Sequence, residues 1–293
     1  MQISAAQVKE LRERTGSGMM ECKKALEATG GDMDLAIDKL RTEGSAKAVK
    51  KAGRVAADGA VANRTSSDNK QAVLAEVNCE TDFVARDENF VNFVNAVVET
   101  ALALKIGDVS SLADAILAGQ NVKVEEARQA LVAKVGENIH VRRLVFKQAA
   151  NTIGTYLHGN RIGVIVELDV PNPELAKDIA MHIAASKPLV ISPEEVPADV
   201  VAKEKEIFMA QAANSGKPQD IIEKMVGGRI KKYLDEVSLL GQPFVKDPNM
   251  TILSLLNKHR AKVVSFTRFE VGEGIEKEKE DFVEAVMAQV QNS

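Results

Sequence analysis

Apolar residues recur at helical spacing through the N-terminal part of the chain. A capping-box pattern at Ser4 and Gln7 starts the first predicted helix, and a glycine-rich turn separates it from the second. The third is expected to start after Asp32 and to end at Gly44. Because three short helices bury little surface on their own, we expect a small docking module over residues 1–55.

The larger part of the chain alternates strand-like and helix-like runs, and it repeats itself. The run 72–78 has a glutamate, Glu76, at its fifth position, and the run 163–169 has Glu167 at the same position. A polar turn and a helical pattern follow each run. The fold class is therefore predicted to be α+β, with a duplicated core of antiparallel sheets and packed helices.

Changes in these patterns divide the chain. A break in the 187–234 segment separates two thin apolar stripes and predicts a helical hairpin inserted into the second repeat. Either a partner or a second copy of the chain covers part of this hairpin, or its two apolar stripes pack only against each other. The predicted units are the N-terminal module (1–55), a first core subdomain (56–150), a second core subdomain (151–186 and 235–274), the hairpin (187–234) and a C-terminal helix (275–293).

The two repeats differ in the turn that follows the strand. The first repeat carries Thr81, Asp82, Phe83 and Val84, whereas the second carries prolines and no aromatic residue at 171–173. Aromatic residues make up only 4% of the chain, and functional contacts concentrate on loops, so the turn is a candidate contact site. The alternative is that Phe83 covers the core, with Thr81 or Asp82 as the N-cap of the next helix.

Composition and charge exclude several classes of function. A net charge of −4 over 293 residues argues against a broad nucleic-acid footprint. The chain has no glycine-rich phosphate loop, so we expect no direct nucleotide binding. Its two cysteines, Cys22 and Cys79, and its four histidines have no metal-ligand spacing, and we expect neither a metal nor a cofactor.

Targeting signals are also missing from the expected places. No apolar run is long enough to predict a membrane span, and Met1 leads into a helix without a signal-peptide pattern. Free thiols suit a reducing compartment. These features predict a cytoplasmic protein with no membrane partner.

Two other function classes stay open at this point. The basic stretch from Lys47 to Arg54 is compatible with an RNA-associated translation protein. Cys22 or His158 could in principle be the catalyst of an enzyme, but no neighbouring base is evident, so an enzyme with covalent chemistry of its own is disfavoured. Neither class accounts for the aromatic turn at Phe83.

Several motifs are spread over nearly the whole length: residues 8–16 with Met19 and Met20, 22–26, 56–59, 76–84, 158–163, 184–188 and 241–245. Together they resemble the bacterial elongation factor Ts family, the guanine-nucleotide exchange factors of elongation factor Tu. The resemblance implies an N-terminal module of the ubiquitin-associated (UBA) type. It also implies that Phe83, within an exchange loop of Thr81, Asp82, Phe83 and Val84, disturbs the Mg²⁺ and phosphate site of the partner.

The resemblance further implies which residues bind the partner and how the cycle ends. GTP displaces the factor, and the hairpin supports a dimer of factor–partner complexes. The implied partner-binding residues are Arg12, Met19, Met20, Lys23, Lys51, Val135, Gly136, His158 and Val245.

Overall fold

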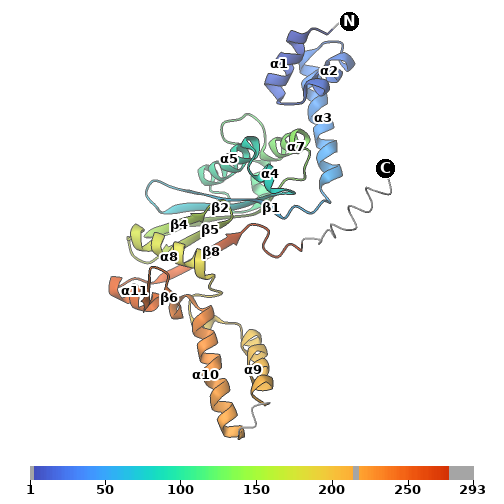
Figure 1. Ribbon diagram of the computed structural model, residues 1–293. Coiled ribbons are helices and arrows are strands. Elements are labelled where there is room, and N and C mark those ends of the chain that lie inside the picture. The colour runs from blue at the N-terminus through green and yellow to red at the C-terminus, as the bar shows by residue number, and fades with distance from the viewer. Residues whose placement is uncertain (1–2, 214–217, 277–293) are drawn as a thin grey trace.

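The computed structural model describes residues 3–213 and 218–276. Figure 1 shows an elongated molecule in which two stacked sheets lie between an N-terminal helical module and a helical hairpin. The module consists of α1 (Ala5–Thr15), α2 (Met19–Ala28) and α3 (Met33–Lys51). Its small core includes Leu11, Cys22 and Leu26. The predicted capping box is present: the Ser4 hydroxyl accepts from the Gln7 N–H at 3.2 Å, and the Ser4 N–H donates to the Gln7 side chain at 3.0 Å.

The third helix does not end at Gly44, so that expectation was wrong. It continues to Lys51 because it packs along α7 (Val124–Val135), where a Cβ at Gly44 would lie 3.5 Å from the Cβ of Ala133. Close packing of two helices outweighs the cost of glycine in a helix, about 1 kcal/mol. Most of the basic stretch from Lys47 to Arg54 therefore lies in the last turns of α3, where cations interact favourably with the helix dipole.

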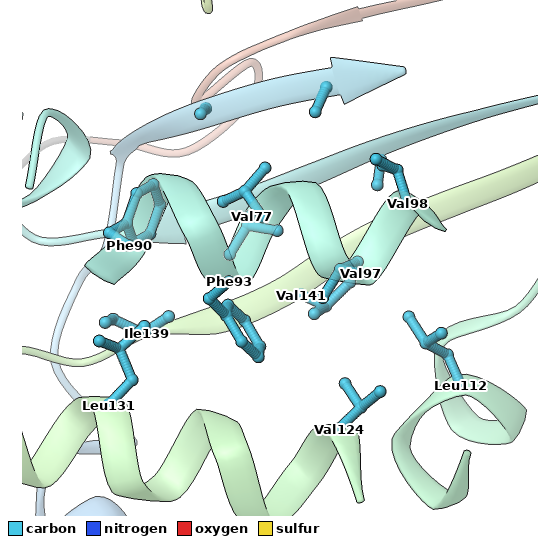
Figure 2. Close-up of a cluster of buried hydrophobic side chains, with 14 of the residues drawn as sticks. Val77, Phe90, Phe93, Val97, Val98, Leu112, Val124, Leu131, Ile139 and Val141 are labelled. Atoms are coloured by element: carbon cyan, nitrogen blue, oxygen red, sulfur yellow. The ribbon is translucent and has the colours of Figure 1, made fainter. Parts of the chain in front are cut away.

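The first sheet is antiparallel, with strand order β1-β2-β3. Four helices cover one face of this sheet. Figure 2 shows the apolar cluster between the sheet and these helices, which includes Phe90 and Phe93 from one helix and Leu131 from α7. The elements are β1 (Asp58–Thr65), β2 (Gln71–Cys79), β3 (His140–Gln148), α4 (Asp82–Ala85), α5 (Glu88–Leu104), α6 (Val109–Asp114) and α7.

The second sheet is also antiparallel and three-stranded, with β5 (Ile162–Leu168) between β4 (Thr152–His158) and β8 (Val263–Glu270). Helix α8 (Pro173–Ser186) covers its outer face. The inner faces of the two sheets pack together, and a Cβ at Gly163 would lie 2.5 Å from Val61 and 2.6 Å from Leu74 of the first sheet.

The internal duplication is confirmed. Glu76 and Glu167 both lie on the central strand of their sheet, and the register shifts immediately after each of them. In both repeats a hairpin of two strands is followed by a helix on the outer face and then by the third strand. The α+β fold class is therefore as predicted.

The inserted helical hairpin is present as α9 (Ala198–Ala213) and α10 (Gln219–Val237), which pack through Phe208, Met209, Ile222 and Val226. No helix among the described residues is long and apolar enough to cross a membrane. Residues 277–293, which make up nearly all of the predicted C-terminal helix, lie outside the described residues. The remaining elements are η1 (Pro193–Glu195), η2 (Leu239–Gly241), β6 (Pro243–Phe244), β7 (Asp247–Thr251) and α11 (Ile252–His259).

Candidate partner-binding site

The aromatic turn of the first repeat points outward. Helix α4 is a single turn whose N-cap is Thr81, with the Thr81 hydroxyl accepting from the Val84 N–H at 3.3 Å. Ala85 is buried and Val84 packs against the core, whereas Phe83 is 80% exposed. The alternative interpretation is therefore confirmed for the N-cap at Thr81 and wrong for Phe83, which does not cover the core. The turn is anchored on one side and presents a large apolar side chain to solvent on the other.

A carboxylate from another part of the chain holds the start of this turn. Glu137 lies in the connection between α7 and β3. One of its oxygens, Oε2, accepts from the N–H groups of Glu80 at 3.1 Å and Thr81 at 3.0 Å. The other, Oε1, accepts from the Thr81 hydroxyl at 2.7 Å. Since hydrogen bonds to a charged acceptor are the stronger kind, these contacts fix the segment that precedes Phe83.

The end of α3 meets the same connection. The Asn138 N–H donates to Glu80 Oε1 at 2.6 Å, and the Asn138 amide donates to the carbonyl of Arg54 at 2.8 Å. The Lys51 ammonium donates to the Gly136 carbonyl. The structure thus brings Lys51 and Gly136, both implied by the resemblance, to the base of the Phe83 turn. The neighbouring Val135 is the last residue of α7 and is half-buried.

His158 lies at the same end of the sheets as the Phe83 turn. It is exposed at the turn between β4 and β5, and its ring stacks on Tyr156 with centroids 6.4 Å apart. Arg161, in the same turn, forms an ion pair with Asp58 at 3.3 Å, and Asp58 pairs with Cys79 at the end of β2. The turn between β4 and β5 therefore lies beside the end of β2, the strand that leads to Phe83.

A second group of candidate residues lies on the N-terminal module. Met19 and Met20 begin α2 and are 59% and 63% exposed, and Arg12 and Lys23 are exposed as well. Methionine adapts to irregular surfaces, which suits a binding face. This surface is joined to the Phe83 turn through α3, whose end is held by the contacts of Asn138 and Gly136.

Val245 lies apart from both groups, in the turn between β6 and β7. Its N–H donates to Nδ1 of the buried His182 at 3.3 Å, and Nε2 of that ring lies 2.9 Å from the Gln242 side-chain oxygen. Nδ1 accepts, so Nε2 carries the proton and the ring is neutral. Burial lowers the pKa of His182, which favours this neutral form.

The two thiols give little support to the interpretation as an enzyme. Burial, reinforced by the negative charges of Glu137 and Asp58, raises the pKa of Cys79 to about 12, so its thiolate is scarce. Cys22 is buried in the module core. Over residues 3–213 and 218–276, no cluster of histidine, cysteine and carboxylate side chains could hold a metal ion.

The basic stretch is largely engaged within the protein. Lys47 forms an ion pair with Glu21, Lys51 donates to a backbone carbonyl, and Arg54 lies 3.5 Å from Glu80. Lys47 and Arg54 nevertheless keep 42% and 55% of their side chains exposed, and Lys50 is exposed as well, so RNA association stays a prediction.

Sequence reasoning missed three residues that shape the site. Glu80, Glu137 and Asn138 connect the Phe83 turn to the end of α3. The only local signal is the small-residue turn that carries Glu137 and Asn138, and it does not show which segment these side chains meet.

The fold is a duplicated α+β core with appended helical elements and an exposed aromatic turn, a form suited to contact with another macromolecule. The family model described as Elongation factor TS matches residues 80–273. Relatives named Elongation factor Ts include those of Legionella pneumophila strain Philadelphia 1, 58% identical over 98% of both chains, and Thioalkalivibrio sulfidiphilus, 58% identical over 100% of both. That of Alkalilimnicola ehrlichii is 53% identical over 100% of both chains. The chain belongs to the elongation factor Ts family.

Proposed function

We propose that this protein is the guanine-nucleotide exchange factor of elongation factor Tu in translation elongation. It binds the GDP complex of that GTPase, disturbs the Mg²⁺ and phosphate site, promotes release of GDP and is displaced when GTP binds. It performs no covalent chemistry and acts in the cytoplasm. The observation that carries the proposal is the 80% exposure of Phe83 on a braced turn, in a chain of this family.

The physical basis is differential affinity. Mg²⁺ and backbone N–H groups hold the phosphates of a bound nucleotide. A factor releases the nucleotide only if it binds the nucleotide-free state more tightly than the GDP state. A rigid aromatic wedge that displaces elements around the Mg²⁺ site meets this condition, since its contacts form only when the site has opened.

The other candidate residues divide between docking and support. Arg12, Met19, Met20 and Lys23 form the docking surface of the N-terminal module. Lys51, Val135 and Gly136 adjoin the wedge, and His158 and Val245 extend the contact across the core. Asp82 flanks Phe83 and pairs with Arg86 at 2.7 Å, which keeps its carboxylate beside the wedge.

The helical hairpin is assigned a separate role in this proposal. It leaves Ile207 and Ile221 exposed on its two helices, 40% and 42% respectively. We assign this surface to the dimer of factor–partner complexes. Sedimentation of the complex with Ile207→Ser and Ile221→Ser should then show a single factor–partner pair, and persistence of the larger species would contradict the assignment.

The wedge is tested by release of a fluorescent GDP analogue from elongation factor Tu under catalytic amounts of the factor. Removing an aromatic anchor from an interface costs about 2 kcal/mol or more, so Phe83→Ala should lose at least about tenfold in acceleration. Leu104→Ala is the matched control, since Leu104 is an exposed apolar residue (56%) at the far end of α5. Equal acceleration by the native chain and Phe83→Ala would refute the wedge role.

A further inference from the structure

The connection between β2 and α4 is two residues long, Glu80 and Thr81. Both of its N–H groups donate to a single carboxylate oxygen of Glu137, at 3.1 and 3.0 Å. The Thr81 hydroxyl donates to the other oxygen at 2.7 Å, while it also caps α4 by accepting from the Val84 N–H. One side chain therefore holds the entire connection that aims α4.

The contact between the two segments is reciprocal. Glu80 in turn accepts from the Asn138 N–H at 2.6 Å, so each segment binds the backbone of the other through a carboxylate. The segment that carries Glu137 is itself fixed: Gly136 is left-handed with φ of 84° at the end of α7, and its N–H donates to the Val132 carbonyl at 2.9 Å. Glu137 is thus presented from a rigid base.

We propose that Glu137 is a positioning residue for nucleotide exchange, which acts through Phe83 by fixing the connection between β2 and α4 in the free protein. This inference rests on the exchange function proposed above. A side chain already held in its bound geometry avoids an ordering cost when the partner opens. Without the carboxylate, α4 loses three hydrogen bonds at its start, and Phe83 meets the partner in a range of orientations.

The expected effect falls on the maximum exchange rate and not on docking. Glu137→Ala should lower the maximum rate about tenfold, the size expected when charge-assisted hydrogen bonds that order a contact are lost. The concentration of GDP-bound partner at half-maximal rate should change by less than about twofold, since the N-terminal docking surface is untouched. Thermal unfolding of each variant checks that the fold is retained.

A conservative variant separates positioning from a general loss of structure. In Glu137→Gln the amide oxygen still accepts from the two N–H groups, and the NH₂ group donates to the Thr81 hydroxyl, so the loss should be only about threefold. Glu125→Gln is the matched control. Glu125 is a half-buried glutamate that binds Arg128 and Gln129 within α7, and its replacement should leave exchange within about twofold of the native rate.

A double variant tests whether Glu137 acts through Phe83. If it does, adding Glu137→Ala to Phe83→Ala should lower the maximum rate by less than a further factor of about two. The proposal would be overturned if the fold-loss in maximum rate of the double variant equalled the product of the two single losses. A native maximum rate in Glu137→Ala alone would also overturn it.

Hydrogen exchange of the free protein supplies a readout that does not depend on the partner. The amide protons of Glu80 and Thr81 should be protected in the native chain and exchange at least about tenfold faster in Glu137→Ala. Unchanged protection would also overturn the proposal. If the native chain fails to accelerate GDP release, the proposed function itself is wrong. If Glu137→Ala accelerates GDP release as well as the native chain does, only this inference is wrong.

Discussion

Replacing Glu76 with glutamine would remove the negative charge at the junction of the two sheets. Glu76 is fully buried on the central strand of the first sheet. It accepts from Arg143 at 2.5 Å, Arg142 at 3.1 Å, the Asn78 amide at 3.0 Å and the Gly272 N–H at 2.8 Å. The last of these contacts comes from the end of the second sheet, so the carboxylate ties the two halves of the core together.

The magnitude follows from the burial of the partners. Removing one member of a fully buried ion pair costs about 3–5 kcal/mol. Here the side chains of Arg142 and Arg143 keep 25% and 29% exposure, so water compensates part of the loss. We therefore expect Glu76→Gln to lower the free energy of unfolding by about 2–3 kcal/mol.

The duplication supplies a matched control. Glu167 occupies the same place in the second repeat, before the same register shift, but it is only half-buried. Within the described residues, its side chain accepts a single hydrogen bond, from Ser265 at 3.3 Å. Glu167→Gln should cost less than about 1 kcal/mol. Urea denaturation of both variants measures the difference. Equal losses in the two variants would refute the assignment of Glu76 as the charge that joins the sheets.

The remaining predictions concern backbone geometry and pH. Gly59 has φ of 137°, and an added Cβ would lie 2.1 Å from the Val77 carbonyl oxygen, so Gly59→Ala should lose about 2–5 kcal/mol in urea denaturation, whereas Gly53→Ala, with nothing within 4 Å, should lose less than about 1. Comparable losses at both glycines would contradict this. Burial lowers the pKa of His182, and burial with the nearby charges of Arg128 and Arg142 lowers that of His140. The unfolded chain therefore binds more protons below about pH 6.5, and the free energy of unfolding should fall as pH drops from about 7.5 to 5.5. His182→Gln should make this dependence shallower, and an unchanged slope would show that His182 does not contribute.

Features set by neighbouring residues could be predicted from the sequence. The capping box at Ser4 and the cap at Asp32 depend on residues three positions apart, and both are present. Runs of a few residues around Glu76 and Glu167 predict the two central strands, and the likeness of these runs predicts the duplication. These are local patterns, in which the sequence carries the physical cause.

Features set by distant parts of the chain could not be predicted. The sequence pattern misplaces the end of α3, because Gly44 packs against Ala133 and no local pattern indicates that contact. The hydrogen bonds of Glu137 with the Phe83 turn join residues more than fifty positions apart. The turn pattern draws attention to Phe83, but only the structure decides whether its side chain covers the core or faces solvent, since exposure depends on what the rest of the core leaves uncovered.

In the proposed mechanism, Phe83 opens the nucleotide site of the partner and does not merely help the two proteins to bind. The most direct test is a stopped-flow measurement of GDP release from elongation factor Tu over a range of factor concentrations up to saturation, with the native chain and Phe83→Ala. Phe83→Ala should lower the maximum release rate at least about tenfold, while the factor concentration at half-maximal rate changes by less than about threefold. If Phe83→Ala reaches the native maximum release rate and only needs a higher concentration of the factor to do so, the proposed mechanism is wrong and Phe83 is a docking residue.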